Sequence, residues 1–240
     1  MRSKSLHWAG RALRKLGNEL MARNATTGTW IDVGAHHGET TVGRANHNPG
    51  LTIYAIEPNP AAVAKIAGRA PNVIVFPFAI AERNGCAEFH INAHEAASSL
   101  LPLDEEGVRR WIGGDQFKEL STIVVPTIRL DTFMDLMEIG TVDFLNIDTQ
   151  GMDLAVVRSA GRRLQDIKRI TLEVSVAEHP VYVGAPSHAE VLKFLEESGF
   201  ALIDRESQTY GQEENLTFVQ RKPRLPAKQA EQTGKPVCQR

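Results

Sequence analysis

Short apolar runs alternate with helical segments along most of this 240-residue chain. Such alternation is typical of a mostly parallel sheet with helices on both of its faces. No helical segment separates the last two runs, which predicts an antiparallel hairpin at one edge of the sheet. We therefore expect an α/β fold with seven strands, at residues 29–33, 51–56, 73–79, 142–147, 170–174, 200–203 and 216–220. The predicted helices lie near residues 40–47, 60–68, 153–164 and 188–198.

Residues 82–140 interrupt this alternation between the third and fourth predicted strands. They contain a hairpin-like piece around 87–91, a polar segment through Ser98 and Ser99, and a helical stretch around 105–111. Long connections in compact domains commonly form binding loops or lids. We therefore assign this region to substrate contact.

The two ends of the chain are basic, whereas its body is acidic. Residues 1–23 carry six Lys or Arg against Glu19, and residues 222–240 carry five against Glu231. Because the whole chain has a net charge of −2, residues 24–221 carry −11. An acidic body repels phosphate backbones, so we expect no nucleic-acid substrate. The Pro, Lys and Gln of residues 222–240 predict a disordered tail, which leaves 24–221 as one folded domain.

Apolar residues from Leu6 to Leu20 recur at spacings of three and four, which predicts an amphipathic helix within residues 1–23. Its basic side chains are left on the opposite face. Two interpretations stay open for this helix. It caps the domain or pairs with a second subunit to form a homodimer, or it contacts anionic lipid as a peripheral membrane helix.

The cysteine count and the hydropathy pattern indicate the cellular location of the protein. Only Cys86 and Cys238 occur, which excludes a disulfide framework. No apolar run approaches the roughly 20 residues of a membrane-spanning helix, and the basic N-terminus lacks the features of a signal peptide. We therefore expect a cytoplasmic protein.

A predicted strand runs into a glycine-containing turn and then into a helix over residues 30–40. Gly34 and Gly38 allow a tight turn and a close approach of the backbone to a ligand. In an open α/β sheet, such a turn lies beside the point where strand order reverses and ligands bind. Alone, the two glycines are a weak signal, and a purely structural turn is the alternative.

A second motif, residues 54–60, ends a strand on an acid about 25 residues after Asp32, close to the spacing of a ribose-binding carboxylate. Glu57 can accept two hydrogen bonds from a vicinal diol, so we expect it to bind a ribose. A solvated acid at a strand end, or a neighbour of Lys65, is the alternative. The turn lacks the G-x-G-x-x-G order of a pyrophosphate site, which disfavours a nicotinamide-dependent oxidoreductase. S-adenosylmethionine has no phosphate, and Asp32 could complement its charged end directly or through water.

The sequence resembles the FkbM family of methyltransferases over about residues 29–221. The resemblance is carried by Ile31-Asp32-Val33-Gly34-Ala35, by Glu57-Pro58-Asn59-Pro60, and by Val-Asp-Phe-Leu-Asn-Ile-Asp-Thr-Gln-Gly at residues 142–151. It continues through Ser98-Ser99-Leu100, Leu130-Asp131-Thr132 and Ser198-Gly199-Phe200. It implies a Rossmann-like methyltransferase fold, S-adenosylmethionine as methyl donor, and a hydroxyl acceptor, commonly on a sugar or a polyketide.

The resemblance also implies which residues form the site. For the cofactor we assign Asp32, Gly34, Ala35, His36, Gly38, Thr40, Glu57, Pro58 and Ala79. For the substrate we assign Ser98, Ser99 and Gln150. The chain departs from the family pattern at three positions, where Asn146 replaces Lys, Gln150 replaces Glu and His36 often replaces Asn. These departures leave open a changed substrate, or an impaired enzyme that serves as a binding protein.

Methyl transfer from a sulfonium to a hydroxyl needs in-line approach and a path for the hydroxyl proton. Asp148, at the end of the fourth predicted strand, is the leading base or metal ligand. Glu173 would approach it if the fourth and fifth strands are neighbours, and His179 follows six residues later. The two acids could bind Mg²⁺, or could position a His base. Asp148 could instead cap the next helix, and His179 could be an ordinary loop histidine.

Overall fold

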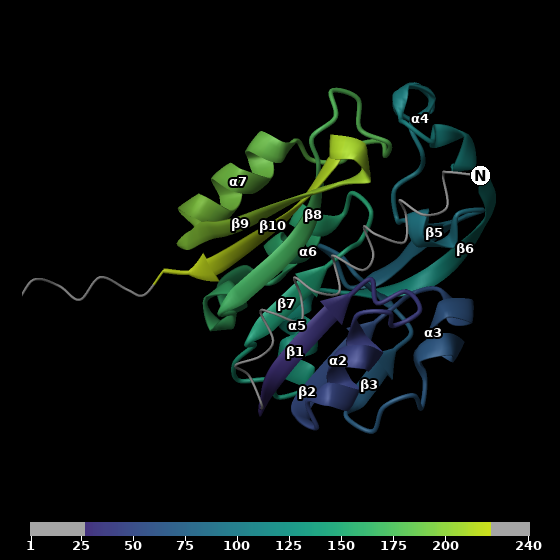
Figure 1. Ribbon diagram of the computed structural model, residues 1–240. Coiled ribbons are helices and arrows are strands. Elements are labelled where there is room, and N and C mark those ends of the chain that lie inside the picture. The colour runs from purple at the N-terminus through teal and green to yellow at the C-terminus, as the bar shows by residue number, and fades with distance from the viewer. Residues whose placement is uncertain (1–26, 222–240) are drawn as a thin grey trace, which may run out of the picture.

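The computed structural model describes residues 27–221, whose main feature is a seven-stranded sheet (Figure 1). Its strands are β1 (Thr27–Val33), β2 (Gly50–Ile56), β3 (Val73–Phe76), β7 (Phe144–Ile147), β8 (Arg169–Ser175), β9 (Phe200–Gln208) and β10 (Glu213–Gln220). Their order in the sheet is β3-β2-β1-β7-β8-β10-β9. The first five strands are parallel, and β10 is antiparallel to both β8 and β9. The expected α/β fold with an antiparallel hairpin at one edge is therefore confirmed.

Strand order reverses between β1 and β7. From β1 the chain moves outward to β2 and β3, and it later returns to the other side of β1 as β7. Open α/β sheets bind ligands beyond the carboxyl ends of their strands at such a point. The register pairs Val33 with Ile147, and Ile147 with Leu172. The residues that follow these positions are therefore brought to the same edge of the sheet.

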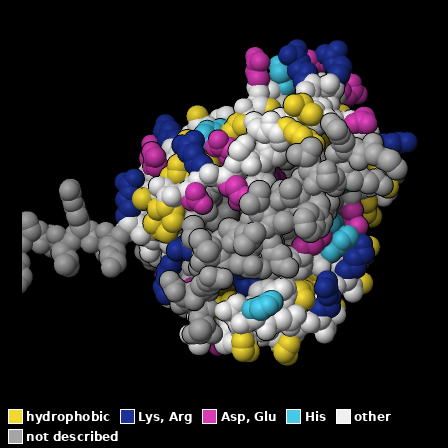
Figure 2. Space-filling model, in the orientation of Figure 1, with side chains coloured by type: hydrophobic (Ala, Val, Ile, Leu, Met, Phe, Trp, Pro, Cys, Tyr) yellow, Lys and Arg dark blue, Asp and Glu magenta, His cyan; other side chains and the backbone are white. Residues whose placement is uncertain are grey.

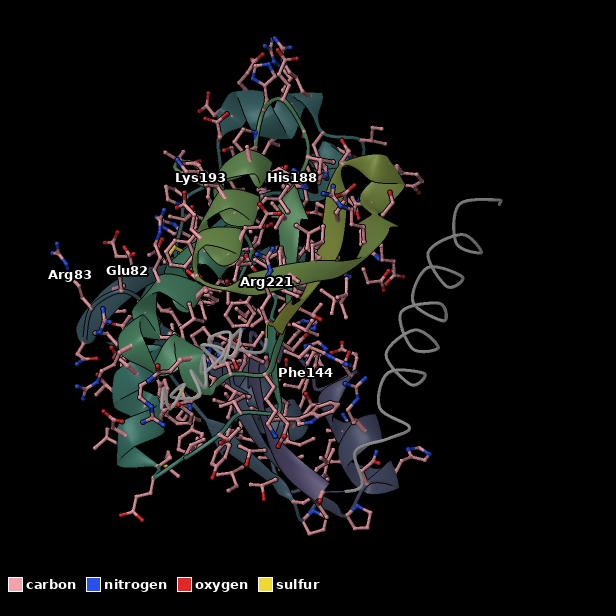
Figure 3. All side chains as sticks on the ribbon, turned by 90° about the vertical axis from the view of Figure 1, so that its left-hand side faces the viewer. Glu82, Arg83, Phe144, His188, Lys193 and Arg221 are labelled. Carbon is pink, nitrogen blue, oxygen red and sulfur yellow. The ribbon has the colours of Figure 1, made fainter. Side chains whose placement is uncertain are left out.

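Helices cover both faces of the large sheet (Figure 1). Successive residues of β1 point to opposite faces, so Trp30 packs in a cluster with Ala45, whereas Ile31 packs in the main core with Phe133. One face carries α2 (Thr41–His47) and α3 (Pro60–Ile66), and the other carries α5 (Leu130–Leu136), α6 (Asp153–Ser159) and α7 (His188–Glu197). Lys193 lies on the exposed side of α7, whereas His188, in its first turn, lies with Nε2 3.1 Å from Glu214 Oε2 of β10 (Figure 3).

Local sequence sets where α3 and α7 begin. Asn59 accepts a hydrogen bond from the backbone N–H of Ala61, and Pro60 suits the first helical turn because its fixed φ is already helical. At α7, Ser187 and Glu190 form a reciprocal capping box. The α3 cap places the residues that precede it, at the carboxyl end of β2, in a defined turn.

The segment between β3 and β7 builds a second sheet with the order β4-β6-β5. Its strands are β4 (Ala79–Ile80), β5 (Gly85–Asn92) and β6 (Glu119–Ile128). The 3₁₀ helix η1 (Glu95–Ala97) and the helix α4 (Glu105–Arg110) lie between β5 and β6. At the turn between β4 and β5, Glu82 and Arg83 point away from the domain (Figure 3).

One expectation about this region is wrong. The third predicted strand, 73–79, ends at Phe76, and Ala79 belongs to β4 of the second sheet. The hairpin-like piece at 87–91 lies in β5, which pairs antiparallel with β6 and, at His90, with Ser99 in an isolated antiparallel bridge. Neither β6 nor α5 was predicted, and α5 packs in the main core, so the end of the 82–140 segment is part of the central domain.

The predicted helix at 153–164 is also shorter than expected. It ends as α6 at Ser159, and a 3₁₀ helix, η3 (Gly161–Asp166), follows. Gly161 has a φ of 50°, in the left-handed region, and a left-handed residue ends a right-handed helix. The fourth strand likewise begins at Phe144, two residues later than predicted.

The predicted N-terminal helix at 1–23 and the predicted tail at 222–240 lie outside the described residues. Across residues 27–221, each helix is too short or too polar to cross a membrane. The predicted domain boundaries at 24 and 221 stay predictions.

Phe133 on α5 offers a test of the packing of the main core. It is 2% exposed, and the rings of Tyr54, Phe76 and Phe78 lie 5.1–5.8 Å from its own, with their edges toward it. Phe133→Ala would leave a cavity among these rings, so we expect a loss of about 3–5 kcal/mol in the free energy of unfolding, measured by urea denaturation. Leu136→Ala on the same helix removes a side chain that is 70% exposed, and should change stability by less than about 0.5 kcal/mol. Equal losses in the two variants would contradict the core position of α5.

Candidate functional site

A cavity of about 1670 Å³ opens where β1, β2 and β7 end. Its walls come from the turns after these three strands, from the start of the second sheet and from η1. Single-ligand pockets are usually about 300–1,000 Å³, so this cavity has room for two ligands side by side. Of the residues predicted for the site, those that line it are Asp32, Gly34, Ala35, His36, Thr40, Glu57, Pro58, Ala79, Ser98, Asp148 and Gln150.

Four predicted site residues do not line this cavity. Gly38 packs inward against α2 and α3, and Ser99 is buried with its hydroxyl donating to the carbonyl oxygen of Gln150 over 2.8 Å. Both therefore shape the site from behind its wall. Glu173 is buried next to a smaller cavity, and His179 lines neither one. The structure thus gives His179 no contact with the site that was predicted for it.

Gly34 lets the turn after β1 touch the turn after β7. Its φ is 80°, and a Cβ atom there would lie 1.9 Å from the backbone carbonyl oxygen of Asp148. Its own N–H donates to the carbonyl oxygen of Ile56 at the end of β2. A larger residue would clash with the backbone and would be strained in this conformation. Glycine at this position therefore brings three strand ends within contact distance.

Glu57 holds the turns after β1 and β2 together. One carboxylate oxygen accepts the N–H of His36 and the other accepts the N–H of Asn59, both over 2.8 Å. The side chain is 6% exposed, and burial raises its pKa, although the two N–H groups and the charge of His36 act in the opposite direction. A carboxylate oxygen can accept more than one hydrogen bond, so Glu57 can still bind hydroxyl groups from the cavity side.

Asp32 is buried at the base of the same cavity. Its carboxylate accepts hydrogen bonds from the hydroxyl of Thr41 and, over 2.8 Å, from the side-chain amide of Asn146. Burial raises the pKa of Asp32, and these two donors lower it in part. Asn146, one of the positions where the sequence departs from the pattern that the resemblance implies, therefore supplies a neutral donor to this acid from β7.

Asp148 and Glu173 lie on either side of one side-chain amide. The Nε2 of Gln150 donates to Asp148 Oδ1 over 2.7 Å and to Glu173 Oε2 over 3.1 Å. This confirms that the two acids are brought together by neighbouring parallel strands. It also shows that an amide group, whose nitrogen carries two hydrogens, bridges them.

Tyr182 anchors the other end of that amide, and it was not predicted from the sequence. Its hydroxyl lies 2.9 Å from Gln150 Oε1 and 2.9 Å from the carbonyl oxygen of Ala97. Burial raises the pKa of Tyr182 well above its ordinary value, as do several nearby acids, so its hydroxyl keeps its proton. No motif marks a tyrosine that is far from Gln150 in sequence and reaches it only through the fold.

Asp153, in the first turn of α6, is a second residue that the sequence did not single out. It is 3% exposed, and its Oδ1 accepts the N–H of Thr149 over 3.4 Å. Burial, and then the charge of Asp148, raise its pKa to about 7. With Glu173 and Tyr182 it borders a cavity of about 30 Å³, large enough for a water molecule. Its position five residues after Asp148 was the one available signal.

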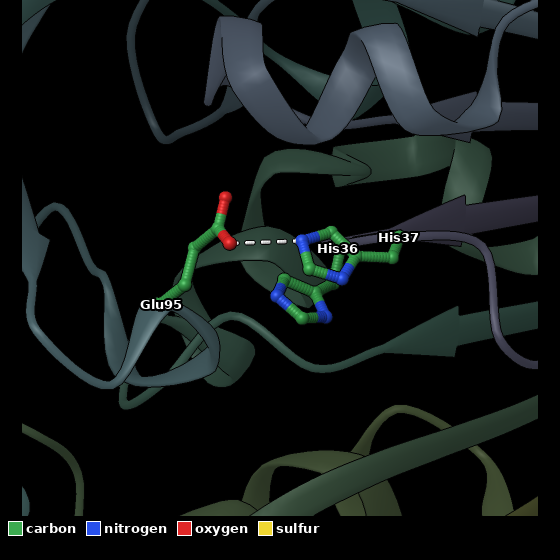
Figure 4. A group of neighbouring side chains, drawn as sticks. All are labelled: His36, His37 and Glu95. Atoms are coloured by element: carbon green, nitrogen blue, oxygen red, sulfur yellow. Dashed lines mark hydrogen bonds and ion pairs between the residues drawn. The ribbon is translucent and has the colours of Figure 1, made fainter.

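His36, His37 and Glu95 form a cluster at the rim of the large cavity (Figure 4). The two rings stack with centroids 3.6 Å apart, and His37 Nε2 lies 2.9 Å from Glu95 Oε2. The ammonium of Lys65 lies 2.6 Å from the same ring nitrogen and 3.1 Å from the same carboxylate oxygen. The ring nitrogens of two nearly parallel stacked imidazoles have lone pairs that run side by side and do not converge on one metal ion. The Lys65 ammonium also pairs with the Glu95 carboxylate. This arrangement therefore fits an ion-pair network better than a metal site.

These ion pairs also shift the titration of the rim. Burial alone would lower the pKa of His36, but its hydrogen bond to Glu39 and the charges of Glu39, Glu57 and Glu95 raise it. Burial would raise the pKa of Glu39, yet its bonds to His36 and to the backbone hold it at about 2. In Glu95, burial is similarly outweighed by Lys65 and by His37, and its pKa is lowered. The rim therefore carries ionised acids at neutral pH.

Comparison with known proteins gives one family match. The methyltransferase FkbM domain matches residues 32–202. No curated protein matches the chain.

Solved structures that are similar to this chain include two methyltransferases and a fibrillarin. Precorrin-6y C5,15-methyltransferase of Geobacter metallireducens is 15% identical, with a TM-score of 0.47, and the match covers 88% of this chain and 87% of that one. Fibrillarin of Aeropyrum pernix, with bound S-adenosyl-L-methionine, is 14% identical, with a TM-score of 0.47 and coverages of 85% and 74%. An S-adenosylmethionine-dependent methyltransferase of Aquifex aeolicus is 13% identical, with a TM-score of 0.45 and coverages of 83% and 87%.

The raised pKa of Asp153 predicts how stability changes with pH. The native state keeps the proton up to about pH 7, whereas the unfolded chain loses it near the ordinary value of 3.8, so Asp153 lowers stability progressively as pH rises between these values. Asp153→Asn removes this effect. The free energy of unfolding of the variant, relative to wild type, should rise by about 2–3 kcal/mol between pH 5 and pH 8.

Urea denaturation at the two pH values measures this difference. Asp115→Asn, which removes an exposed carboxyl group, controls for the loss of one negative charge. If the Asp153 and Asp115 variants follow the same pH dependence, the buried carboxyl group is not protonated in the folded protein.

Proposed function

Since this chain belongs to the FkbM methyltransferase family, and is an S-adenosylmethionine-dependent methyltransferase, we propose that it methylates an uncharged hydroxyl group. The acceptor belongs to a sugar, a glycan or a polyketide-type natural product. The observation that carries this proposal is the meeting of Glu57, Asp32 and Asp148 at one cavity, from the ends of β2, β1 and β7. Together they offer a carboxylate for a ribose, acidic groups for a sulfonium, and a base.

The chemistry of the cavity wall fits S-adenosylmethionine. Glu57 would accept the two ribose hydroxyls while it holds the turn of His36 and Asn59 in place. His36 Nε2 and Thr149 Oγ1 are buried polar atoms that make no hydrogen bond to the described residues, and both residues line the cavity. Such atoms are rare unless a ligand or water satisfies them. The bound donor supplies the activated methyl carbon, and the protein supplies orientation and a proton path.

The charges around the cavity favour a neutral acceptor over a phosphorylated one. Its described lining includes five acidic residues, Asp32, Glu39, Glu57, Glu95 and Asp148, against one Arg or Lys, Arg44. The guanidinium of Arg44 lies 4.1 Å from the ring centre of Trp30, so it is already engaged. An anionic acceptor would meet repulsion here. On the face in Figure 2, Lys and Arg are interspersed with Asp and Glu, which also suits the proposal that nucleic acid is not the substrate.

We propose that Asp148 takes the proton of the acceptor hydroxyl. It lines the cavity at the carboxyl end of β7, whereas Glu173 lies behind Gln150. The Gln150 amide bridges the two carboxylates that were predicted to hold Mg²⁺. An N–H donor in that place binds a carboxylate pair without a metal, so the proposed reaction proceeds through Asp148 alone.

We retain the proposal of a cytoplasmic protein, for which the exposed free thiol of Cys86 on β5 is support, since free thiols persist in reducing compartments. Attachment of the N-terminal segment to anionic lipid, or its use in a homodimer, stays a prediction that vesicle flotation and sedimentation can test.

Glu57 provides the test of the donor site. S-adenosylmethionine or its demethylated product should raise the melting temperature of the wild-type protein, whereas NAD should not, because only a ligand of the native state stabilises it. Glu57→Gln loses a charge-assisted partner for the ribose and should weaken donor binding by about 1–3 kcal/mol in calorimetry. Glu88→Gln, which changes an exposed acid on β5, should bind the donor as wild type does. Unchanged affinity in the Glu57 variant would leave that acid with a purely structural role.

Asp148 provides the test of the chemical step. Transfer from tritiated S-adenosylmethionine should occur to members of a panel of methyl glycosides and macrolide alcohols, and not to sugar phosphates. Asp148→Asn should lower that turnover by about 10²–10⁴-fold with little change in donor affinity, as expected for the loss of a positioned base.

Asp115→Asn serves as the matched control, because it makes the same change at an exposed site. Activity of the Asp148 variant within about threefold of wild type would contradict the base, since that corresponds to less than 1 kcal/mol of barrier. Loss of wild-type turnover in EDTA, restored by Mg²⁺, would contradict the metal-free reaction.

A further inference from the structure

Gln150 is held in a backbone conformation that its residue type rarely adopts. Its φ is 56°, and that of Gly151 is 91°, so two successive residues of the turn after β7 are left-handed. A non-glycine residue in this region persists only where the surrounding structure determines it. The contacts that hold Gln150 in this conformation should therefore indicate the role of the turn.

Two hydroxyl groups from outside the turn hold Gln150. The hydroxyl of Ser99 donates to its main-chain carbonyl oxygen over 2.8 Å, and the hydroxyl of Tyr182 lies 2.9 Å from its side-chain Oε1. A Cβ atom on Gly151 would meet the Cβ atoms of Ala185 and Tyr182 at 3.2 and 3.3 Å, so the turn also has little room to shift. Main chain and side chain are thus held by different segments.

The two carboxylates decide which way the Gln150 amide faces, and Tyr182 holds it there. Carboxylates only accept hydrogen bonds, so the amide nitrogen must face them and the amide oxygen faces the Tyr182 hydroxyl, whose single hydrogen it shares with the carbonyl oxygen of Ala97. The nitrogen then directs its two hydrogens at Asp148 Oδ1 and Glu173 Oε2, over 2.7 and 3.1 Å. The reversed amide would place its oxygen against two carboxylates. Loss of the Tyr182 hydroxyl would remove the partner of the amide oxygen, so the hydroxyl steadies a contact of Asp148, which it does not itself touch.

Tyr182 is itself well placed for such a task. It is 6% exposed and packs in a small apolar cluster with Trp111 and Val181. Its hydroxyl also meets the carbonyl oxygen of Ala97 in η1, over 2.9 Å. The ring is therefore immobilised by packing, and the hydroxyl links η1 to the turn that follows β7.

We propose that Tyr182 is a positioning residue of the methyl transfer, which acts through the Gln150 amide to hold the Asp148 carboxylate toward the acceptor hydroxyl. Supporting groups that fix a reacting group to a fraction of an ångström are a general requirement of such sites. The inference rests on the proposed role of Asp148 as the base. In this proposal the neutral amide of Gln150 takes part in the methyl transfer by orienting Asp148.

The first test needs no acceptor. In the full-length ¹⁵N-labelled protein bound to S-adenosylhomocysteine, the two side-chain amide protons of Gln150 should exchange slowly with solvent, because both are hydrogen-bonded. Tyr182→Phe keeps the packed ring and removes the hydroxyl, so their exchange should accelerate by about tenfold or more. Equal exchange in the two proteins would overturn the proposal.

The second test separates positioning from general damage. With an equimolar mixture of methyl glycosides as the acceptor, Tyr182→Phe should lower kcat by about tenfold and leave the KM for S-adenosylmethionine unchanged. In Asp148→Asn, the added Tyr182 change should lower kcat no further, because the group it positions is already lost. Tyr54→Phe, a half-buried tyrosine of β2 outside the cavity, should keep wild-type turnover.

Each outcome decides a different claim. If Asp148→Asn lowers turnover and Tyr182→Phe behaves as Tyr54→Phe, the positioning role is overturned while the proposed base stands. If Asp148→Asn keeps wild-type turnover, the proposed base and the positioning role of Tyr182 are both overturned. Losses that multiply in the double variant would also overturn the inference, since they would indicate a structural effect. If Tyr182→Phe fails to fold, Gln150→Met replaces it, because it keeps the side-chain volume and removes the amide. Gln150→Met should then lower kcat alone and lower it no further in the Asp148→Asn background. Wild-type turnover of Gln150→Met would overturn the proposal.

Discussion

The site depends on the contact between Gly34 and the backbone of Asp148. The N–H of Asp148 donates to the carbonyl oxygen of Val33 over 3.0 Å, so the β1–β7 ladder continues to the point where the two strands diverge. Gly34 then turns away within van der Waals reach of the Asp148 carbonyl group, where any Cβ would collide. Because Gly34 also bonds to Ile56, the turns after three strands share one small volume. Side chains from these turns consequently face a single cavity, at spacings set by the sheet.

Burial of acids is the electrostatic consequence of that crowding. Asp32 and Glu57 are each less than 10% exposed, and burial raises the pKa of both. Their ionised forms are stabilised by donors, and for Asp32 one of these is the amide of Asn146. Gln150 serves Asp148 in the same way. The two positions where the resemblance implies Lys and Glu thus carry neutral amides here, and the pair of changes leaves the net charge as it would be. Asn146 donates to Asp32 and Gln150 donates to Asp148, so both acids are hydrogen-bonded by the amides at these two positions.

The large sheet could be predicted from sequence because its strands are apolar and its helices begin at recognisable caps, such as Asn59-Pro60 and Ser187. The second sheet could not. β6 is largely exposed, and its pairing with β5 is set by contacts across a long loop, which hydropathy does not encode. The same limit applies to the site. Asp148 and Glu57 follow buried strands and could be predicted from their place at strand ends. Tyr182 and Asp153 matter through partners or burial that only the folded chain supplies.

The short stretch around η1 connects the donor and acceptor sides of the cavity. Glu95 accepts hydrogen bonds from Asn59 over 3.2 Å and from Lys65 over 3.1 Å, which ties η1 to α3 beside Glu57. Two residues further, the carbonyl group of Ala97 meets the Tyr182 hydroxyl that orients Gln150. A shift of η1 would therefore change the donor turn and the orientation of the proposed base together. Since η1 also lines the cavity, an acceptor that moves it on binding would act on both. Polar contacts of this kind break and re-form at lower cost than a packed apolar interface, so η1 can shift at lower cost than the packed helices of the domain.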